Sequence, residues 1–262
     1  MADRRYTYCG ILTMMAITGG EIPELEVRGA FSGEWRNLPE RRISFHFYTG
    51  GDEEVLSYGA FCMKCGRMPV IRGAIDFYPW HLLGLAAFFY VADKQGGAGL
   101  WFYDPDCSCD VVYLEPVAGT GKMVLTVRKN RHYDNPDENV CPVKFRCLVE
   151  RERFLGDFRK ALSKKVSDPA LEKWMVPRVN EAFAEGLDRE EKLARVRKAE
   201  EIAAGAAPYE SDSGEMEMYE VKMKYDNLEY LAAALREVNV IRQDPWVFGK
   251  PLPERKLEEF VS

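Results

Sequence analysis

Histidine is scarce in this chain, which limits the acid–base chemistry open to it. Only His46, His81 and His132 occur among 262 residues. Histidine is the side chain whose ordinary pKa lies closest to neutral pH, so it is the commonest general base in enzymes. His46 alternates with Phe45 and Phe47, which predicts that it faces away from the core of a strand. We therefore expect structural or exposed histidines and a protein that is not an enzyme.

Long apolar runs are also missing. The longest, residues 80–91, is interrupted by His81 and Gly84 and is shorter than the roughly 20 residues that a membrane-spanning helix needs. Near the N-terminus, the apolar stretch 9–17 is broken by Thr13 and is not followed by a small-x-small cleavage site. We therefore expect no membrane partner and no export.

The chain has no basic stripe and no paired set of cysteines. Its net charge is −6, and Lys and Arg are spread along its length, which argues against a nucleic-acid partner. Seven cysteines are an odd number, and this suits reduced thiols better than a secreted disulfide framework. The sequence therefore predicts a cytoplasmic protein.

What the chain does have is enough apolar surface for a full core. Hydrophobic residues make up 47% and aromatic residues 12%, which excludes a disordered chain. Up to about residue 150 the pattern has period two, most clearly where Ile43, Phe45 and Phe47 alternate with polar residues. Gly-rich turns, such as Gly119-Thr120-Gly121, separate the short apolar segments. This pattern predicts a meandering antiparallel sheet.

Helices are expected at two places in this region and throughout the region that follows it. Residues 79–89 are apolar nearly all round, as in a buried helix, and residues 154–162 have one apolar face, as in a helix that closes the sheet domain. After residue 167 we expect helices, and then a small β-α-β appendage with strands at 218–225 and 238–241. The prediction is an α+β fold with a sheet domain, 1–166, and a C-terminal region, 167–262, docked on it.

Two cysteine pairs form the sharpest local motif. Cys62 and Cys65 have the CxxC spacing of a zinc knuckle, in which two thiols bind the metal from one side. Cys107 and Cys109 form a second pair, and together the four thiols make a candidate four-cysteine zinc site. The CxC pair and the long gap between the pairs are unusual for a compact zinc module, so free thiols at a strand end are the competing interpretation.

The alternating pattern of residues 143–149 argues against a cysteine nucleophile. Cys147 shares its parity with Val143, Phe145 and Val149, which places it on the core face of a strand, where a thiol is inert packing. His132 is the base that it would need, and that residue lies in a polar loop. We expect neither a catalytic residue nor a bound cofactor, with zinc as the exception that stays open.

The order of the expected elements resembles small bacterial immunity proteins of the WapI kind. The resemblance rests on the strand meander, the helix entry Phe77-Tyr78-Pro79-Trp80-His81-Leu82-Leu83, two strands near residues 100 and 111, and the closing helix at 154–162. It covers residues 25–165, while the cysteine pairs and the C-terminal region depart from it. It implies a protein that neutralises a toxin, or a host or phage factor, by surface complementarity and without an active site.

The expected function is therefore non-catalytic binding of another protein. Candidate contacts are an acidic patch and two aromatic residues in the tail that we expect to be exposed, because aromatics rimmed by charge are typical of interfaces. These residues are Glu210, Asp212, Glu215, Glu217, Trp246 and Phe248. The alternative for the aromatic pair is that it pins the tail onto the core, and the alternative function is a zinc protein with the four-cysteine site.

Overall fold

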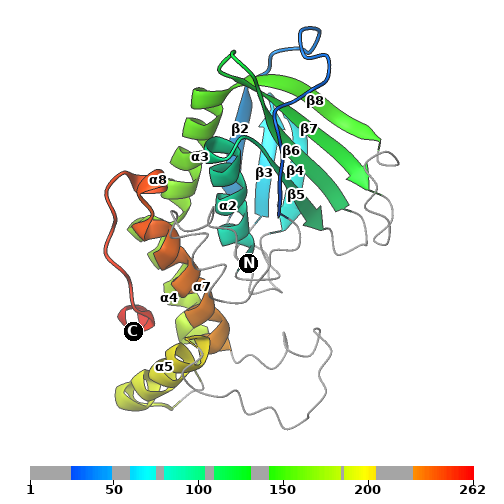
Figure 1. Cartoon of the computed structure of the whole chain (residues 1–262). Helices are drawn as coiled ribbons and strands as arrows, with labels where there is room; N and C mark the ends of the chain where they lie inside the picture. The colour runs from blue at the N-terminus through cyan, green and yellow to red at the C-terminus, as the bar shows by residue number, and fades with distance from the viewer. Residues whose placement is uncertain are drawn as a thin grey trace, which may run out of the picture.

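The computed structural model describes residues 25–48, 60–74, 80–103, 109–130, 142–183, 186–204 and 227–262. Figure 1 shows two groups of strands that face each other at one end of the molecule. The strands are β1 (Leu25–Val27), β2 (Ile43–Tyr48), β3 (Ala60–Cys65), β4 (Met68–Ala74), β5 (Ala98–Tyr103), β6 (Cys109–Val117), β7 (Lys122–Asn130) and β8 (Val143–Glu150).

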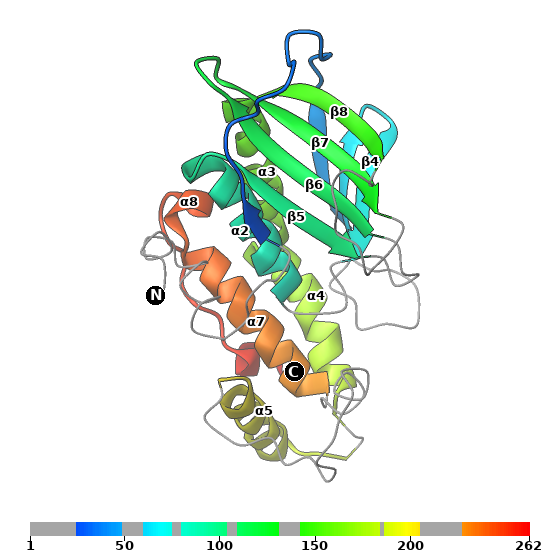
Figure 2. The ribbon, with the colours of Figure 1, turned by 45° about the vertical axis from the view of Figure 1, so that its right-hand side comes forward.

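The helices divide between the sheets and the opposite end of the molecule. They are α2 (Trp80–Lys94), α3 (Arg151–Lys165), α4 (Asp168–Glu181), α5 (Arg189–Ala203), α7 (Asn227–Gln243), the short α8 (Pro245–Phe248) and the 3-10 helix η2 (Leu257–Phe260). Figure 2 shows α2 and α3 against the sheets, whereas α4, α5 and α7 extend away from them. The helix at the end of the sheet region therefore leads directly into a helical C-terminal region.

The α+β fold predicted from the sequence is confirmed, and the strands within each sheet are antiparallel. They form a five-stranded sheet, in the order β1-β5-β6-β7-β8, and a three-stranded sheet, β2-β3-β4. The turn between β6 and β7 contains Gly119 and Gly121, both with positive φ, a conformation that side chains with a Cβ rarely adopt. The Gly-rich segments thus make hairpins, as the pattern indicates.

A short segment before β2 links the two sheets. Leu148 of β8 donates to the Pro39 carbonyl at 3.0 Å and accepts from the Arg41 N–H at 2.9 Å. Glu40, which lies between them, forms a parallel bridge with Leu148. The chain therefore follows β8 for a few residues and then diverges from it to become β2.

The prediction of a β-α-β appendage is wrong for its second strand. Residues 238–241 lie inside α7, where Val238 and Ile241 are fully buried. Leu231, Leu235 and Val238 continue at the three- and four-residue spacing of a helix, and this period prevails over the β-branched composition of four residues. The first expected strand, 218–225, lies outside the described residues.

One hydrophobic core runs through both expected regions. It includes Phe89 of α2 and Phe158 of α3, whose rings stack with centroids 3.7 Å apart. The same cluster of buried residues extends to Trp174 in α4 and Leu231 in α7. The core is thus continuous across residue 166, the expected boundary between the sheet domain and the C-terminal region.

Within the described ranges, every helix falls short of the length and apolarity that crossing a bilayer requires.

Candidate functional site

Helix α3 packs against β2 on the face of the strand that Phe45 and Phe47 share. Strand β8 ends at Glu150, whose carboxylate caps α3 by accepting from the N–H groups of Glu152 and Arg153 at 3.1 and 2.8 Å. The chain therefore changes from strand to helix at the point where it has just paired with the segment before β2. Helix α3 then packs on β2 through Phe154 and Phe158, which both contact Phe45.

A groove of about 530 Å³ lies between β2 and α3, and we call it the β2–α3 groove. Its floor is apolar and includes Phe45, Phe47 and Ala161. Its walls are lined by basic side chains and one carboxylate. The polar residues that line it are Arg42, Ser44, His46, Asp157, Lys160, Lys164 and Lys165.

The groove is positively charged although the whole chain carries a net charge of −6. Four Lys or Arg residues line it against one acidic residue, Asp157. Asp157 pairs with Arg42 across the groove at 3.8 Å. Lys160 and Lys164 are exposed, and among the described residues neither has a carboxylate partner. Two unneutralised ammonium groups therefore face the groove.

Helix stability explains part of this arrangement. Lys164 and Lys165 lie in the last turn of α3, where cations interact favourably with the helix dipole. Lys160 lies one turn earlier, outside the last turn in which that effect is appreciable. The dipole also gives no reason for these lysines to line the side of the helix next to β2. Helix stability alone therefore does not account for this arrangement.

A smaller cavity of about 180 Å³ continues the groove toward the start of β2. It shares Arg42 and Asp157 with the larger one and adds Arg41 and Arg153. Its added acids are already engaged, since Glu150 caps α3 and Glu40 pairs with Lys122 at 2.5 Å. The positive charge therefore extends along the groove to this end.

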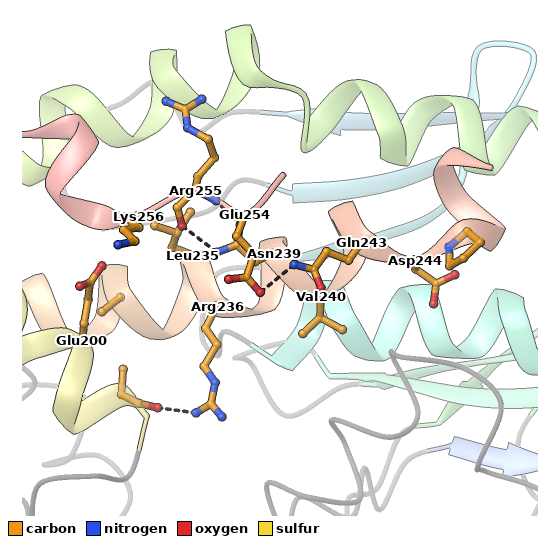
Figure 3. Close-up of a pocket in the computed structure, with 13 residues that line it drawn as sticks. Glu200, Leu235, Arg236, Asn239, Val240, Gln243, Asp244, Glu254, Arg255 and Lys256 are labelled. Atoms are coloured by element: carbon orange, nitrogen blue, oxygen red, sulfur yellow. Dashed lines mark hydrogen bonds between the residues drawn. The ribbon is translucent and has the colours of Figure 1, made fainter. Parts of the chain in front are cut away.

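A second cavity, of about 520 Å³, lies between α5, α7 and the tail, and we call it the C-terminal cleft. Figure 3 shows that Asn239 and Gln243 point toward the tail, whereas Arg236 points away from it, toward the end of α5. Asn239 donates to the Arg255 carbonyl at 2.8 Å and accepts from the Arg255 N–H at 2.9 Å. Gln243 donates to Glu254 at 2.7 Å, and Arg236 donates to the Ala203 carbonyl at 2.7 Å. The polar groups of this cleft thus hold the chain's own tail and helix ends.

Arg242 lies at the centre of this attachment and is fully buried. It donates to the Val166 carbonyl at 2.9 Å and to the Pro253 carbonyl at 3.1 Å, and it pairs with Asp168 at 2.8 Å. Burial alone would raise the pKa of Asp168, but Arg255 and Arg242 outweigh burial and hold it below its ordinary value. One buried cation therefore joins the end of α3, the start of α4 and the tail.

The expectation that Trp246 is exposed is wrong, because it is only 9% exposed. Its indole Nε1 donates to Asp93 at 2.8 Å, and its ring packs edge-on against Tyr90. Phe248 is half-buried and packs on the same core. A tryptophan with a carboxylate partner at the end of α2 is a structural anchor. The alternative interpretation holds, in which the pair pins the tail to the core.

The CxxC pair does not form a knuckle that presents both thiols on one side. It lies at the end of β3, where Cys62 pairs with His46 and Cys65 pairs with Ile43. Because side chains alternate along a strand, the two thiols lie on opposite faces. Cys62 is buried, and Cys65 packs against the core.

The second cysteine pair is only partly described. Cys109 begins β6, in the other sheet, and Cys107 lies outside the described residues. Among the described residues, no three potential metal ligands cluster together. The four-cysteine zinc site stays a prediction that the position of the first pair does not favour.

Cys147 lies on the core face of β8 and is fully buried. Burial is the main cause that raises the pKa of its thiol to about 12, with smaller effects from Cys65 and Arg41. A thiol with such a pKa is protonated at neutral pH and is a poor nucleophile. This agrees with the interpretation of Cys147 as inert packing. His132 lies outside the described residues, and His46 is half-buried with its Nε2 3.0 Å from Ser44 Oγ.

The β2–α3 groove was not predicted from the sequence. The acidic patch that was predicted lies outside the described part of the chain. Glu210, Asp212, Glu215 and Glu217 all fall within residues 205–226. A signal for the groove does exist, because Lys160 and Lys164 have the i,i+4 spacing that places them on one side of a helix. That spacing cannot show that the side faces a strand from a distant part of the chain.

Comparison of the chain with protein-family models, with curated proteins and with solved structures finds no match.

Proposed function

We propose that this protein is a cytoplasmic, non-catalytic binding protein whose partner is another protein, and that the β2–α3 groove is its recognition surface. The specific form of the proposal is an immunity protein or inhibitor, which neutralises a toxin or a host or phage factor. The observation that carries the proposal is the groove itself. Basic side chains with an apolar floor form a cavity of about 530 Å³ on a chain with a net charge of −6.

The chemistry of this surface supports recognition rather than catalysis. Phe47 and Ala161 give apolar contact area, while Lys160 and Lys164 give charge that selects an acidic partner and speeds its approach. Cys147, a candidate nucleophile, is held protonated in the core. A protein that acts by surface complementarity needs this combination of apolar area and selective charge.

Affinity capture from extracts of the native host tests the proposal. We expect the wild-type protein to retain a stoichiometric protein partner. The double variant Lys160→Glu, Lys164→Glu should lose that partner, because it reverses the charge of the groove. A control, Lys173→Glu with Lys198→Glu, makes the same charge change at exposed positions on α4 and α5 and should retain it. Equal capture by all three proteins, or no stoichiometric partner for the wild type, would contradict the proposal.

A further inference from the structure

Strand β2 is at the edge of its sheet. In the order β2-β3-β4, only β3 pairs with it, and within the described residues no strand pairs with its other edge beyond Arg41. The β2–α3 groove runs along this edge. Four consecutive residues, Ser44 to Phe47, all line it, whereas a cavity on one face of a strand would be lined by alternate residues only. The groove therefore borders the backbone of β2 as well as its side chains.

Helix α3 shields this edge without pairing with it. The N–H and C=O groups of a helix bond to one another along its axis, so a helix beside a strand cannot continue the sheet. Edge strands with accessible backbone groups bind extended peptides, which add as a further strand. At β2, an added strand would lie between the edge and the lysines of α3.

The lysine spacing on α3 matches the repeat of such a strand. Lys160 and Lys164 are one helical turn apart, which is about 6 Å along the axis. Side chains on one face of a strand repeat every two residues, about 6.6–6.8 Å. Two acidic residues at alternate positions of a bound strand would therefore each lie opposite one lysine. The apolar floor at Phe47 and Ala161 accommodates the aliphatic parts of those side chains.

We propose that the β2–α3 groove binds an extended acidic segment of the partner protein, which pairs with the open edge of β2 and places alternate carboxylates opposite Lys160 and Lys164. The backbone of β2 supplies affinity that does not depend on sequence, and the lysines supply selectivity for acids at every second position. This inference rests on the proposed function, because it names the chemistry and the binding mode of the partner.

The alternative occupant of a basic groove is a nucleic acid. The phosphate groups of a nucleic acid only accept hydrogen bonds, so they could not pair with the backbone carbonyls of an edge strand. An edge strand also offers backbone donors and acceptors in the repeat of a peptide. The groove therefore fits an acidic peptide better than a phosphate backbone.

The test uses the full chain and a short peptide labelled at its N-terminus, fluorescein-Thr-Glu-Thr-Glu-Thr-Glu-Thr-Glu-amide, with binding measured by fluorescence anisotropy at low and at moderate salt. We expect saturable binding that weakens as salt rises. Reversing both lysines, by Lys160→Glu with Lys164→Glu, should weaken binding about tenfold or more. The control pair Lys173→Glu, Lys198→Glu should bind within about twofold of wild type.

Three matched probes separate strand pairing from charge attraction. The same peptide methylated at its backbone nitrogens keeps every charge but loses its N–H donors, and it should bind about tenfold more weakly. A peptide with its four Thr followed by its four Glu keeps the composition but not the alternation, and it should also bind more weakly. A single-stranded oligothymidylate of equal charge should bind more weakly than the alternating peptide. Equal binding of either altered peptide, or tighter binding of the oligonucleotide, would overturn the inference.

The outcomes also separate this inference from the proposed function. If the alternating peptide fails to bind but the lysine pair is needed to capture a host protein, the function stands and the strand-addition mode is wrong. If the peptide binds as expected but no host partner is found, the groove has the proposed specificity and the assignment as a binding protein is wrong.

Lys160→Gln with Lys164→Gln removes the charge without reversing it and should give an intermediate loss of peptide affinity. Peptide binding equal to wild type in this variant would contradict the role of the lysines.

Discussion

The molecule contains two cavities of similar volume whose polar side chains differ in what they contact. In the C-terminal cleft, the described side chains Arg236, Asn239 and Gln243 bind the chain itself. In the β2–α3 groove, Lys160 and Lys164 have no carboxylate partner among the described residues. A cavity lined by polar groups thus indicates a binding site only when those groups are not already used to hold the fold together. By this criterion the cleft is structural, and the groove is the surface that we propose for recognition.

The largest expected effect tests the structural side of this comparison. Replacing Arg242 by Ala would remove the donor that joins the buried Val166 carbonyl to the Pro253 carbonyl and the Asp168 carboxylate. Hydrogen bonds to a charged group contribute about 1.5–3 kcal/mol each, so loss of the two bonds to these carbonyls should lower the unfolding free energy by about 3–6 kcal/mol. Chemical denaturation would measure it, with Arg197→Ala, an exposed arginine of α5, as the control. A loss below about 1 kcal/mol would show that the cleft does not hold the tail as described.

A smaller effect is expected at Asn239, whose amide binds both the N–H and the carbonyl of Arg255. Asn239→Ala should lower the unfolding free energy by about 1–3 kcal/mol, because two backbone groups lose their partner. Gln243→Ala serves for comparison, since its bond to Glu254 is exposed and its loss should cost under about 1 kcal/mol. Equal losses at the two positions would remove the distinction between a clamp and a surface contact.

The attachment of the tail to α2 should make stability depend on acid pH. Burial by itself would raise the pKa of Asp93, but Lys94, Trp246 and Arg151 together lower it below its ordinary value of 3.8. A carboxyl group whose pKa is lower in the folded state stabilises the fold above its unfolded pKa, and that contribution is lost as pH falls through the folded pKa. The contribution of Asp93 is therefore complete above about pH 5 and declines below about pH 4.

Comparison with Asp93→Asn isolates this contribution. We expect the difference in unfolding free energy between wild type and variant to be constant near neutral pH and to shrink as pH falls below about 4. Urea denaturation at a series of acid pH values measures it. A difference that stays constant throughout would mean that the Asp93 carboxylate is not held ionised by Trp246 and its neighbours.

The smallest effect on stability is expected in the groove. Lys160→Glu with Lys164→Glu changes two exposed side chains that have no carboxylate partner among the described residues. Reversing Lys164 loses its favourable interaction with the dipole of α3, which is worth about 0.3–1 kcal/mol. The change at Lys160 should alter the unfolding free energy by no more than about 0.5 kcal/mol. A thermal melt of this variant beside Arg242→Ala makes the contrast direct. A large loss in the lysine variant would mean that the groove, too, is structural.

Local periodicity was enough to predict the sheet region. The alternation around Phe45, the Gly-rich turn at Gly119 and Gly121, and the core face that contains Cys147 were all readable because each depends on neighbours within a few residues. The α+β class follows from the same signals. The prediction of a strand at 238–241 was wrong for the same reason. It considered only four residues and not the helical spacing that begins at Leu228.

The residues of the proposed recognition surface could not be predicted in this way, because the groove joins segments more than a hundred positions apart. Lys160 and Lys164 are visible as a pair on one side of a helix, but only the tertiary structure places that side beside β2. Trp246 is the opposite case, in which a residue predicted to lie on the surface is buried. It was expected to be exposed because it is an aromatic residue near charged residues in the tail. Its partner, Asp93, lies 153 positions earlier in the chain, and no local pattern reveals it.

Residue-resolved amide exchange in β2, measured by NMR with and without the alternating Thr-Glu peptide, tests the recognition surface most directly. Alternate residues of β2 already pair with β3, and those that face the groove should exchange faster in the free protein. The account predicts that the peptide slows exchange of this second set within 43–48. Unchanged exchange along β2, with slowing in α7 or the tail instead, would contradict it and assign recognition to the C-terminal cleft.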